Sequence, residues 1–219
     1  MNIGIIGAGN IGSTLTRRLA ALGHKISVAN SHGPDSLTAL ARETGARPVT
    51  VHEAARSGEV VIVSIPEGRV PDLPRDLFDG VPDSVVIVDT GNYYPQRDGR
   101  IDEIEAGLPE SQWVQQQLGR SVVKAFNNIR AQHLMALGRP PGDPRRIALP
   151  VAGDNPAATR IVLALVDELG FDGIDAGPLE YSWRQQPGTP VYITDLDADR
   201  VRHALDNAGR ERKPEWRTA

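Results

Sequence analysis

The strongest constraint on the fold of this chain is the glycine pattern Gly7-Ala8-Gly9-Asn10-Ile11-Gly12 near its start. The pattern directly follows an apolar run that predicts a strand over residues 2–6. It opens an amphipathic segment that predicts a helix from Asn10 to Gly23. Between a strand and a helix, GxGxxG is typical of a dinucleotide-binding turn, because its glycines allow a tight turn, a close approach of a pyrophosphate and close packing of the helix. The alternative interpretation is a glycine-rich turn that binds nothing.

The remainder of the chain alternates apolar strands with amphipathic helices, which predicts a doubly wound α/β fold. The runs at 60–63 and 85–88 are continuous and rich in β-branched residues, as expected of strands buried on both faces of a mostly parallel sheet. We expect further strands at residues 25–29, 47–51, 121–125, 146–152 and 171–176. We expect helices at 36–44, from a cap at Asp154 to Gly170, and around 196–208, and a long surface loop at 89–110.

The end of the second predicted strand indicates which dinucleotide is bound. In NAD-binding proteins an acidic residue there holds the ribose 2′-hydroxyl, but here the strand ends in Asn30, Ser31 and His32. Asn30 and Ser31 can hydrogen-bond a 2′-phosphate, and His32 adds charge when it is protonated. The sequence therefore favours NADP over NAD. The same residues also suit a plain turn, which is the alternative.

Polar residues follow three other predicted strands. They are Ser64 before Ile65 and Pro66, Asn92 in the segment after residue 88, and Asn127 after the strand near residue 123. In an open α/β sheet the ligand crevice lies at the carboxyl ends of the strands, so we expect these residues to face the crevice beside the glycine turn. The alternative is that each of these polar residues simply begins an ordinary loop, which would account for any one of them taken alone.

The composition excludes several classes of function. The chain of 219 residues has no cysteine, so a bound cofactor must carry the electrons of any redox reaction. Its net charge of −4, without a cluster of Lys and Arg, argues against a nucleic-acid partner. No stretch approaches the roughly 18 apolar residues of a membrane helix, and no leader is visible, so we expect no membrane association and a cytoplasmic location.

No metal site is predicted either. The histidines lack paired ligand spacing. Asp195, Asp197 and Asp199 resemble the start of a calcium loop, but Arg200 stands where that loop requires glycine, which favours helix capping. The aromatic residues near Tyr94 and Trp183 suit either the wall of a flat ligand or a dimer interface.

Several motifs together resemble the coenzyme F420-dependent NADP oxidoreductases. They are the glycine motif, Ser64-Ile65-Pro66, the run Val122-Val123-Lys124-Ala125-Phe126-Asn127-Asn128, and Ala152-Gly153-Asp154 through Asp175-Ala176-Gly177-Pro178-Leu179. The resemblance implies a Rossmann-like domain with a small C-terminal α/β extension. It also implies NADPH in the glycine crevice, a deazaflavin stacked on the nicotinamide, and a homodimer. The cytosolic domain of mammalian metalloreductases looks similar and uses a flavin instead.

The resemblance also implies roles for individual residues. Residues 8–11 would line the pyrophosphate, Asn30 and Ser31 would take the 2′-phosphate, and Ile65, Pro66 and Ala125 would lie along the ribose and nicotinamide. The family commonly has arginine at the position of His32, which is a weaker and pH-dependent substitute. The candidate cofactor-binding residues are Gly7, Ala8, Gly9, Asn10, Ile11, Gly12, Asn30, Ser31, His32, Ser64, Ile65, Pro66 and Ala125, and the candidate substrate-binding residues are Asn92, Asn127 and Trp183.

The predicted activity is hydride transfer between NADPH and coenzyme F420 or a flavin, for which no catalytic residue is nominated because the cofactors carry the chemistry. A break rich in Gly and Pro at 138–144 divides the chain into an NADP-binding Rossmann domain, 1–144, and an extension, 145–219, that completes the substrate crevice. The two parts could also form one continuous domain. The alternative functions are an NADP-dependent reductase of a small imine or carbonyl substrate and a non-catalytic NADP-binding module.

Overall fold

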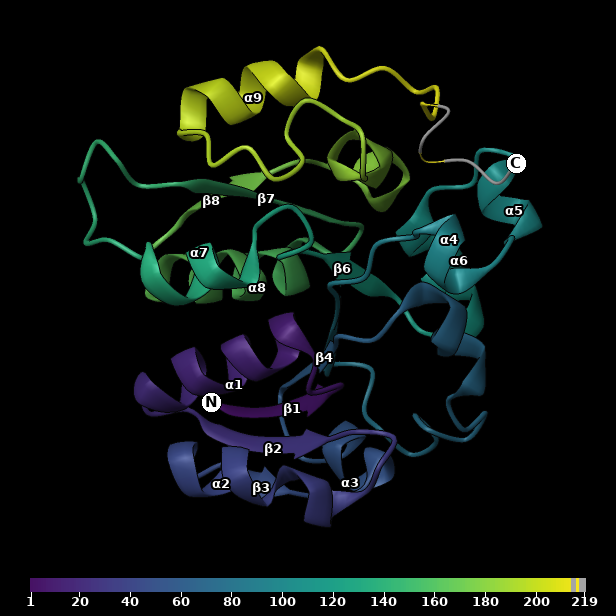
Figure 1. The fold of residues 1–219 in the computed structure, drawn as a ribbon, viewed down its shortest axis with the longest axis vertical. Coiled ribbons are helices and arrows are strands. Elements are labelled where there is room, and N and C mark those ends of the chain that lie inside the picture. Colours follow the sequence, from purple (N-terminus) through teal and green to yellow (C-terminus); the bar gives the residue numbers. More distant parts are fainter. Residues whose placement is uncertain (214–215, 217–219) are drawn as a thin grey trace.

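The computed structural model, which describes residues 1–213 and residue 216, is built around one twisted sheet (Figure 1). Within these residues the sheet has eight strands in the order β3-β2-β1-β4-β5-β6-β7-β8. Strands β1 to β6 pair in parallel, β7 runs antiparallel to β6, and β8 runs parallel to β7. The bounds are β1 (Asn2–Ile6), β2 (Lys25–Ala29), β3 (Arg47–Pro48), β4 (Val60–Val63), β5 (Val86–Asp89), β6 (Val122–Lys124), β7 (Ala148–Gly153) and β8 (Asp172–Asp175). This topology confirms the predicted Rossmann-like, mostly parallel fold.

Helices cover both faces of the sheet, because successive residues of a buried strand point to opposite sides. Ile5 of β1 packs with Leu15 on one face, whereas Ile6 packs with Ala55 on the other. The four residues of β4 are all buried, and each side chain of this kind contributes about 1.5–3 kcal/mol when it is fully removed from water. The helices are α1 (Asn10–Ala21), η1 (Pro34–Leu37), α2 (Thr38–Thr44), α3 (Val51–Ala55), η2 (Glu67–Asp72), α4 (Pro95–Asp98), α5 (Asp102–Glu105), α6 (Glu110–Leu118), α7 (Ala131–Ala136), α8 (Pro156–Glu168), η3 (Leu179–Gln185) and α9 (Ala198–Asp206).

The segment at 89–110 differs from the predicted surface loop. It contains the single-turn helices α4 and α5, and it buries Tyr93 completely beside Ile104 and the α6 residue Trp113. These apolar residues form a small core of their own, which the sequence did not reveal because one-turn helices are too short to show a period. Neither α6 nor α7 was expected.

Other ends of helices and strands differ from the predicted ones for local reasons. The third strand ends at Pro48 because Thr50 and Glu53 form a capping box that starts α3 at Val51. Helix α8 is capped by Asn155 rather than Asp154, whose carboxylate instead accepts a hydrogen bond from the Leu179 amide at 2.9 Å. Asp197 caps α9 as predicted, by accepting from the Arg200 amide at 2.9 Å.

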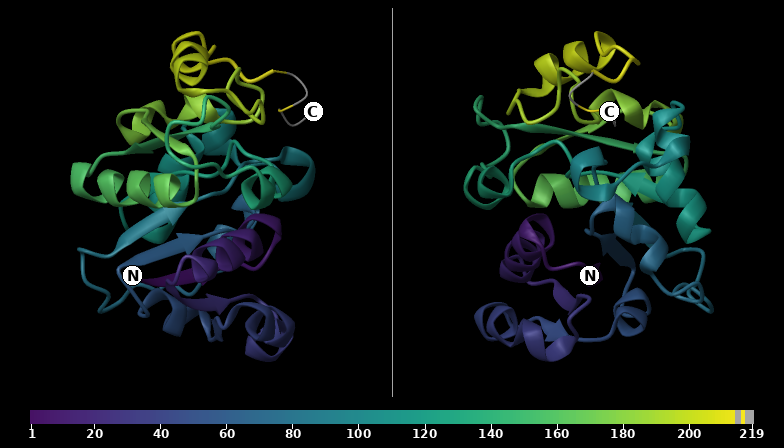
Figure 2. Two further views of the ribbon diagram at one scale, coloured as in Figure 1. Left: turned by 90° about the vertical axis from the view of Figure 1, so that its left-hand side faces the viewer. Right: turned by 45° about the vertical axis from the view of Figure 1, so that its right-hand side comes forward.

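The sheet continues across the break at 138–144. Strand β7 follows the break and pairs with β6 through Val123 and Gly153, and through Lys124 and Ala152. The two further views in Figure 2 show that α9 lies at one end of the molecule, and that β2 and α2 lie toward the opposite end. The division at 144 remains a prediction. No helix of the described residues is long and apolar enough to cross a membrane.

Candidate functional site

The glycine turn lies at the carboxyl end of β1, and its three glycines have different environments. Gly7 has a φ of +105°, and a Cβ there would lie 2.2 Å from the carbonyl oxygen of Ser64. A Cβ on Gly12 would lie 1.9 Å from the carbonyl oxygen of Gly7. A Cβ on Gly9 would meet no atom of residues 1–213 or 216 within 4 Å. Gly7 and Gly12 are thus needed for the turn itself, whereas Gly9 leaves open space in front of the backbone.

Helix α1 begins at this turn with free hydrogen-bond donors. Its N-cap residue is Gly9, no side chain among the described residues caps the helix, and its first turn has no acidic residue. The unsatisfied N–H groups and the positive end of the helix dipole therefore face the open space beside Gly9. This arrangement suits a phosphate group.

A cavity of about 930 Å³, the glycine-turn pocket, opens at this point. Its size lies in the usual range of small-molecule sites. Nine of the candidate cofactor-binding residues line it together with Thr50, Val51 and the segment after β4. The nine are Gly7, Ala8, Gly9, Asn30, Ser31, His32, Ser64, Ile65 and Pro66.

Within this pocket, the side chain of Asn30 mainly holds the second-strand turn. Its Oδ1 accepts from the His32 amide at 2.9 Å, and its Nδ2 donates to Ser36 Oγ at 2.9 Å. Ser36 Oγ also donates to the Gly33 carbonyl at 2.7 Å. Because Asn30 is engaged in this way, the exposed side chains of Ser31 and His32 are the groups of the turn that are available to an anion.

Sequence reasoning missed Arg69, which lines the same pocket from η2. Its side chain is exposed and forms an ion pair with Asp72, Nη1 to Oδ2 at 3.0 Å. Nothing in the local pattern sets this arginine apart. Only the path of η2 after β4 brings it to the pocket of the second-strand turn.

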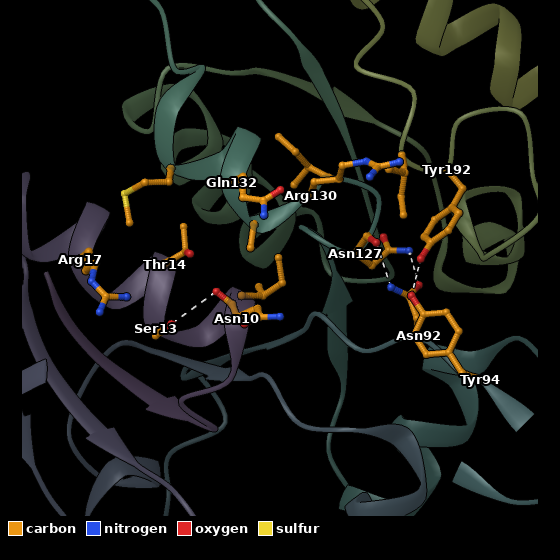
Figure 3. Close-up of a pocket in the computed structure, with 15 residues that line it drawn as sticks. Asn10, Ser13, Thr14, Arg17, Asn92, Tyr94, Asn127, Arg130, Gln132 and Tyr192 are labelled. Carbon is orange, nitrogen blue, oxygen red and sulfur yellow. Dashed lines mark hydrogen bonds between the residues drawn. The ribbon is translucent and has the colours of Figure 1, made fainter. Parts of the chain in front are cut away.

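A second cavity, of about 670 Å³, lies beside the start of α1 (Figure 3). We call it the tyrosine pocket, after Tyr94 and Tyr192. Asn10 and Ile11, two more of the candidate cofactor-binding residues, line it. The other residues are Ser13, Thr14 and Arg17 of α1, Asn92 and Tyr94, Asn127, Ile129, Arg130, Ala131, Gln132 and Met135, and Tyr192 with Ile193. Among these described residues two are cationic and none is acidic.

Asn92 and Asn127, the candidate substrate-binding residues, meet in this pocket but are largely bonded to each other. Asn92 Nδ2 donates to the Asn127 carbonyl at 2.9 Å, and Asn127 Nδ2 donates to Asn92 Oδ1 at 3.0 Å. Asn127 also exchanges hydrogen bonds with Gln185, giving one to its carbonyl at 2.7 Å and accepting one from its Nε2 at 2.9 Å. Asn127 therefore joins three loops and has little capacity left for a ligand.

A buried charge network supports the loop that carries Asn92. Lys124 is fully buried, and its Nζ donates to Asp89 Oδ2 at 3.0 Å and to the Gly91 carbonyl at 2.6 Å. Ser111 Oγ donates to the same Asp89 oxygen at 2.7 Å. Burial lowers the pKa of Lys124, but the carboxyl groups around it outweigh burial and raise its pKa above the ordinary value. The charged lysine thus fixes the backbone next to Asn92.

Glu67 of η2 is also fully buried, with its Oε1 3.9 Å from Lys124 Nζ. Neither of its carboxyl oxygens has a hydrogen-bond partner among the described residues. Burial, and then the nearby charge of Asp89, raise the pKa of Glu67 well above its usual value. The buried site of Glu67 therefore favours the protonated form of its carboxyl group relative to an exposed glutamate.

Three candidate residues line neither pocket. Gly12 is buried against the glycine turn, and Ala125 is fully buried at the end of β6. Trp183 of η3 lies apart, with the guanidinium groups of Arg184 and Arg210 each 5.9 Å from its ring. Tyr192, and not Trp183, is the aromatic residue that the structure brings to Tyr94. The sequence offered no sign of this role for Tyr192 beyond its aromatic ring.

Fold and site together define a Rossmann-type dinucleotide-binding protein. The chain belongs to the family described as NADP oxidoreductase, coenzyme F420-dependent, whose sequence model it matches over residues 2–93. It is therefore an NAD(P)-dependent oxidoreductase.

The chain is also similar to individual proteins. The hypothetical protein SMa0349 from Sinorhizobium meliloti is similar over 91% of this chain and 97% of its own, with 30% identity and a TM-score of 0.76. A protein from Arthrobacter sp. FB24 named "putative F420 dependent NADP-reductase" shares the fold at 22% identity, with a TM-score of 0.66 over 82% of this chain and 86% of its own. The Escherichia coli (strain K12) protein named "Putative protein YjhV" is 43% identical over 79 residues, which are 34% of this chain and 58% of that protein.

Proposed function

We propose that this protein transfers a hydride between NADPH and a deazaflavin such as coenzyme F420, or a flavin in its place. The observation that carries the proposal is the meeting of two pockets at the start of α1, where Gly9 lines one and its neighbour Asn10 lines the other. A direct hydride transfer requires adjoining sites, because the donor and acceptor atoms must come into contact. The family match supports this pairing of substrates.

In this proposal the glycine-turn pocket holds NADPH. The free N–H groups of α1 bind the pyrophosphate, and Ser31 and His32 face the 2′-phosphate. Ile65 and Pro66 supply apolar contact beside the turn. When bound, NADPH supplies the hydride. The chain itself therefore has to bind and orient NADPH and the acceptor, and to keep water away from them. The residues at 30–32 favour NADPH over NADH because none of them would repel a phosphate.

The tyrosine pocket takes the acceptor. Its wall combines the rings of Tyr94 and Tyr192 with cationic and amide groups from α1 and from the start of α7. Aromatic rings provide flat apolar contact area, and Arg130 suits an acceptor that bears a phosphate. Arg17 adds positive charge, although its Nε already donates to Glu43 Oε1 at 2.7 Å. Lys124 and the Asn92–Asn127 pair keep this wall rigid, which lowers the entropic cost of binding.

The decisive experiment combines purified protein with NADPH and, in turn, coenzyme F420, FMN, FAD and riboflavin, and follows the loss of NADPH absorbance. We expect rapid turnover with at least one of the four, and slower turnover with NADH as donor. Reduction of small imines or carbonyls alone would favour the alternative reductase. Tight NADPH binding with no turnover of any acceptor would favour a binding module. The homodimer is a further proposal, which sedimentation at several protein concentrations would test.

A further inference from the structure

Two tyrosine hydroxyl groups meet at one end of the tyrosine pocket. Tyr94 Oη and Tyr192 Oη form a hydrogen bond, and Figure 3 shows these hydroxyl ends beside Asn92 and Asn127. The two residues are 98 positions apart in the chain, so only the fold brings them together. Neither residue belongs to the glycine turn or to the buried charge network.

A count of protons shows what the pair offers to a ligand. Two phenol groups carry two protons, and their mutual hydrogen bond uses one of them. The second proton is left to donate. Among the described residues no hydrogen bond joins either hydroxyl to the neighbouring amide oxygens, where Asn127 Oδ1 accepts from Gln185 and Asn92 Oδ1 accepts from Asn127. The pair is therefore a hydrogen-bond donor on the wall of a pocket that has two cationic and no acidic side chains among its described residues.

The surrounding structure holds the pair in place. Trp216 packs against both rings, with centroid distances of 5.8 Å to Tyr94 and 6.0 Å to Tyr192. Ile193 follows Tyr192 with a φ of +56°, a conformation that β-branched residues rarely adopt, and its amide donates to the Asn128 carbonyl at 2.9 Å. Such strain persists only where neighbouring contacts enforce it, and it is common at functional sites.

The hydroxyl of Tyr192 remains protonated under physiological conditions. Burial, and then the hydrogen bond with Tyr94, raise the pKa of Tyr192 far above its usual value. A neutral phenol donates a hydrogen bond and does not act as a base. The free proton of the pair can therefore be donated to a hydrogen-bond acceptor on the ligand, such as a carbonyl oxygen or a ring nitrogen.

We propose that the Tyr94–Tyr192 hydroxyl pair recognises the hydride acceptor by donating one hydrogen bond to a carbonyl oxygen or ring nitrogen of its flat ring system. This inference rests on the proposed function, since it places the acceptor in the tyrosine pocket. The ring system of flavins and deazaflavins carries such carbonyl groups. The pair would select these acceptors over flat apolar molecules, because a buried donor without a partner is costly.

The test uses Tyr94→Phe, Tyr192→Phe and the double variant, which keep the rings against Trp216 and remove only hydroxyl groups. Binding of FMN and of coenzyme F420 is measured by their fluorescence without NADPH, and NADPH affinity is measured by calorimetry. Because one hydroxyl still has a proton to donate, at least one single variant should stay within about threefold of the wild type. The double variant should bind both acceptors about 5- to 30-fold more weakly, with NADPH affinity unchanged.

A control and a second measurement separate recognition from a purely structural effect. Tyr181→Phe removes an exposed hydroxyl outside both pockets and should bind like the wild type. Raman difference spectra of bound FMN should show a carbonyl-stretching band that shifts to higher frequency in the double variant only. If the wild type binds FMN or F420 and the double variant binds them equally well, this inference is overturned while the proposed function stands. If the wild type binds neither of these and turns over none of the four acceptors, both are overturned.

Discussion

Among single residues, the glycines of the first turn have different roles, since one is needed for folding and another for binding. Gly12 has no room for a side chain, whereas Gly9 has open space on the side of the α1 N-terminus. The same residue type is therefore required for different reasons at positions three apart. This difference can be measured, because the two substitutions should affect different properties.

Gly9→Val should abolish NADPH binding without harming the fold, since its side chain would occupy the space in front of the free N–H groups. Calorimetry should detect no NADPH binding, and the melting temperature should stay within a few degrees of the wild type. Gly12→Val is the matched comparison, because its Cβ would collide with the Gly7 carbonyl and should lower stability by several kcal/mol. Unchanged NADPH affinity in Gly9→Val would contradict the assignment of the glycine turn.

Asn30→Asp should change the choice between the two dinucleotides. The carboxylate can still accept from the His32 amide and from Ser36 Oγ, so the turn should persist, but the new charge repels a 2′-phosphate. NADPH should bind about 10- to 100-fold more weakly, and NADH should be little affected. His32→Arg should act in the opposite sense and tighten NADPH by up to about 1–2 kcal/mol. An unaltered ratio of the two dissociation constants in Asn30→Asp would place the phosphate elsewhere.

Among the elements, the described part of the segment after α9 contacts the core through Arg212 as well as through Trp216. Arg212 forms an ion pair with Glu110, the first residue of α6, which is fully buried. Its guanidinium also lies 4.9 Å from the centroid of the Tyr93 ring, and its Nη1 donates to the Trp216 carbonyl at 3.0 Å. Arg212 thereby links the chain after α9 to α6 and to the ring that packs on the tyrosine pair.

Arg212→Gln should lower the free energy of unfolding by about 1–3 kcal/mol, because it leaves Glu110 buried without its charged partner. The loss should be limited by protonation of Glu110, since burial already raises the pKa of that carboxyl against the opposing effect of Arg212. Urea unfolding provides the measurement. Arg210→Gln is the neighbouring control, and this exposed position should change stability by less than about 0.5 kcal/mol. Equal effects of the two substitutions would contradict the anchoring role.

For the molecule as a whole, the buried acid Glu67 should make stability depend on pH. Its pKa is raised in the folded state, whereas in the unfolded chain it ionises near the ordinary value. Between these two pKa values the folded state binds one proton more than the unfolded state. Stability should therefore be highest below the unfolded pKa and fall as pH rises, by about 1.4 kcal/mol per pH unit, up to the folded pKa.

Glu67→Gln should remove this dependence, because the amide has a similar shape and does not ionise. Urea unfolding at about pH 5 and about pH 8 should show that the variant gains stability relative to the wild type at the higher pH. Glu103→Gln, at an exposed position of α5, should leave the pH profile as it is. If Glu67→Gln follows the wild-type profile in parallel, Glu67 is not the group responsible.

Much of this molecule follows from short-range patterns in the sequence. The turn at Gly7, the buried run of β4 and the ends of β2 were predictable because backbone sterics, hydrophobic periodicity and strand propensity act over a few residues. The fold class followed from the alternation of such segments. The segment at 89–110 was predicted wrongly because its apolar residues show no period. They are buried by packing with Trp113 of α6, which lies outside the segment.

The sequence by itself determined the class of fold, the glycine turn and the missing acidic residue after β2, since each is encoded by neighbouring residues. Only the tertiary structure decided the partners of the polar side chains. In the folded chain Asn30 and Asn127 hydrogen-bond to loops and hold them in place. Lys124 lies beside Glu67 and Asp89, and Tyr94 pairs with Tyr192. The physical reason is that a buried polar group must find its hydrogen bonds wherever the packed chain offers them, and distance along the sequence does not limit that choice.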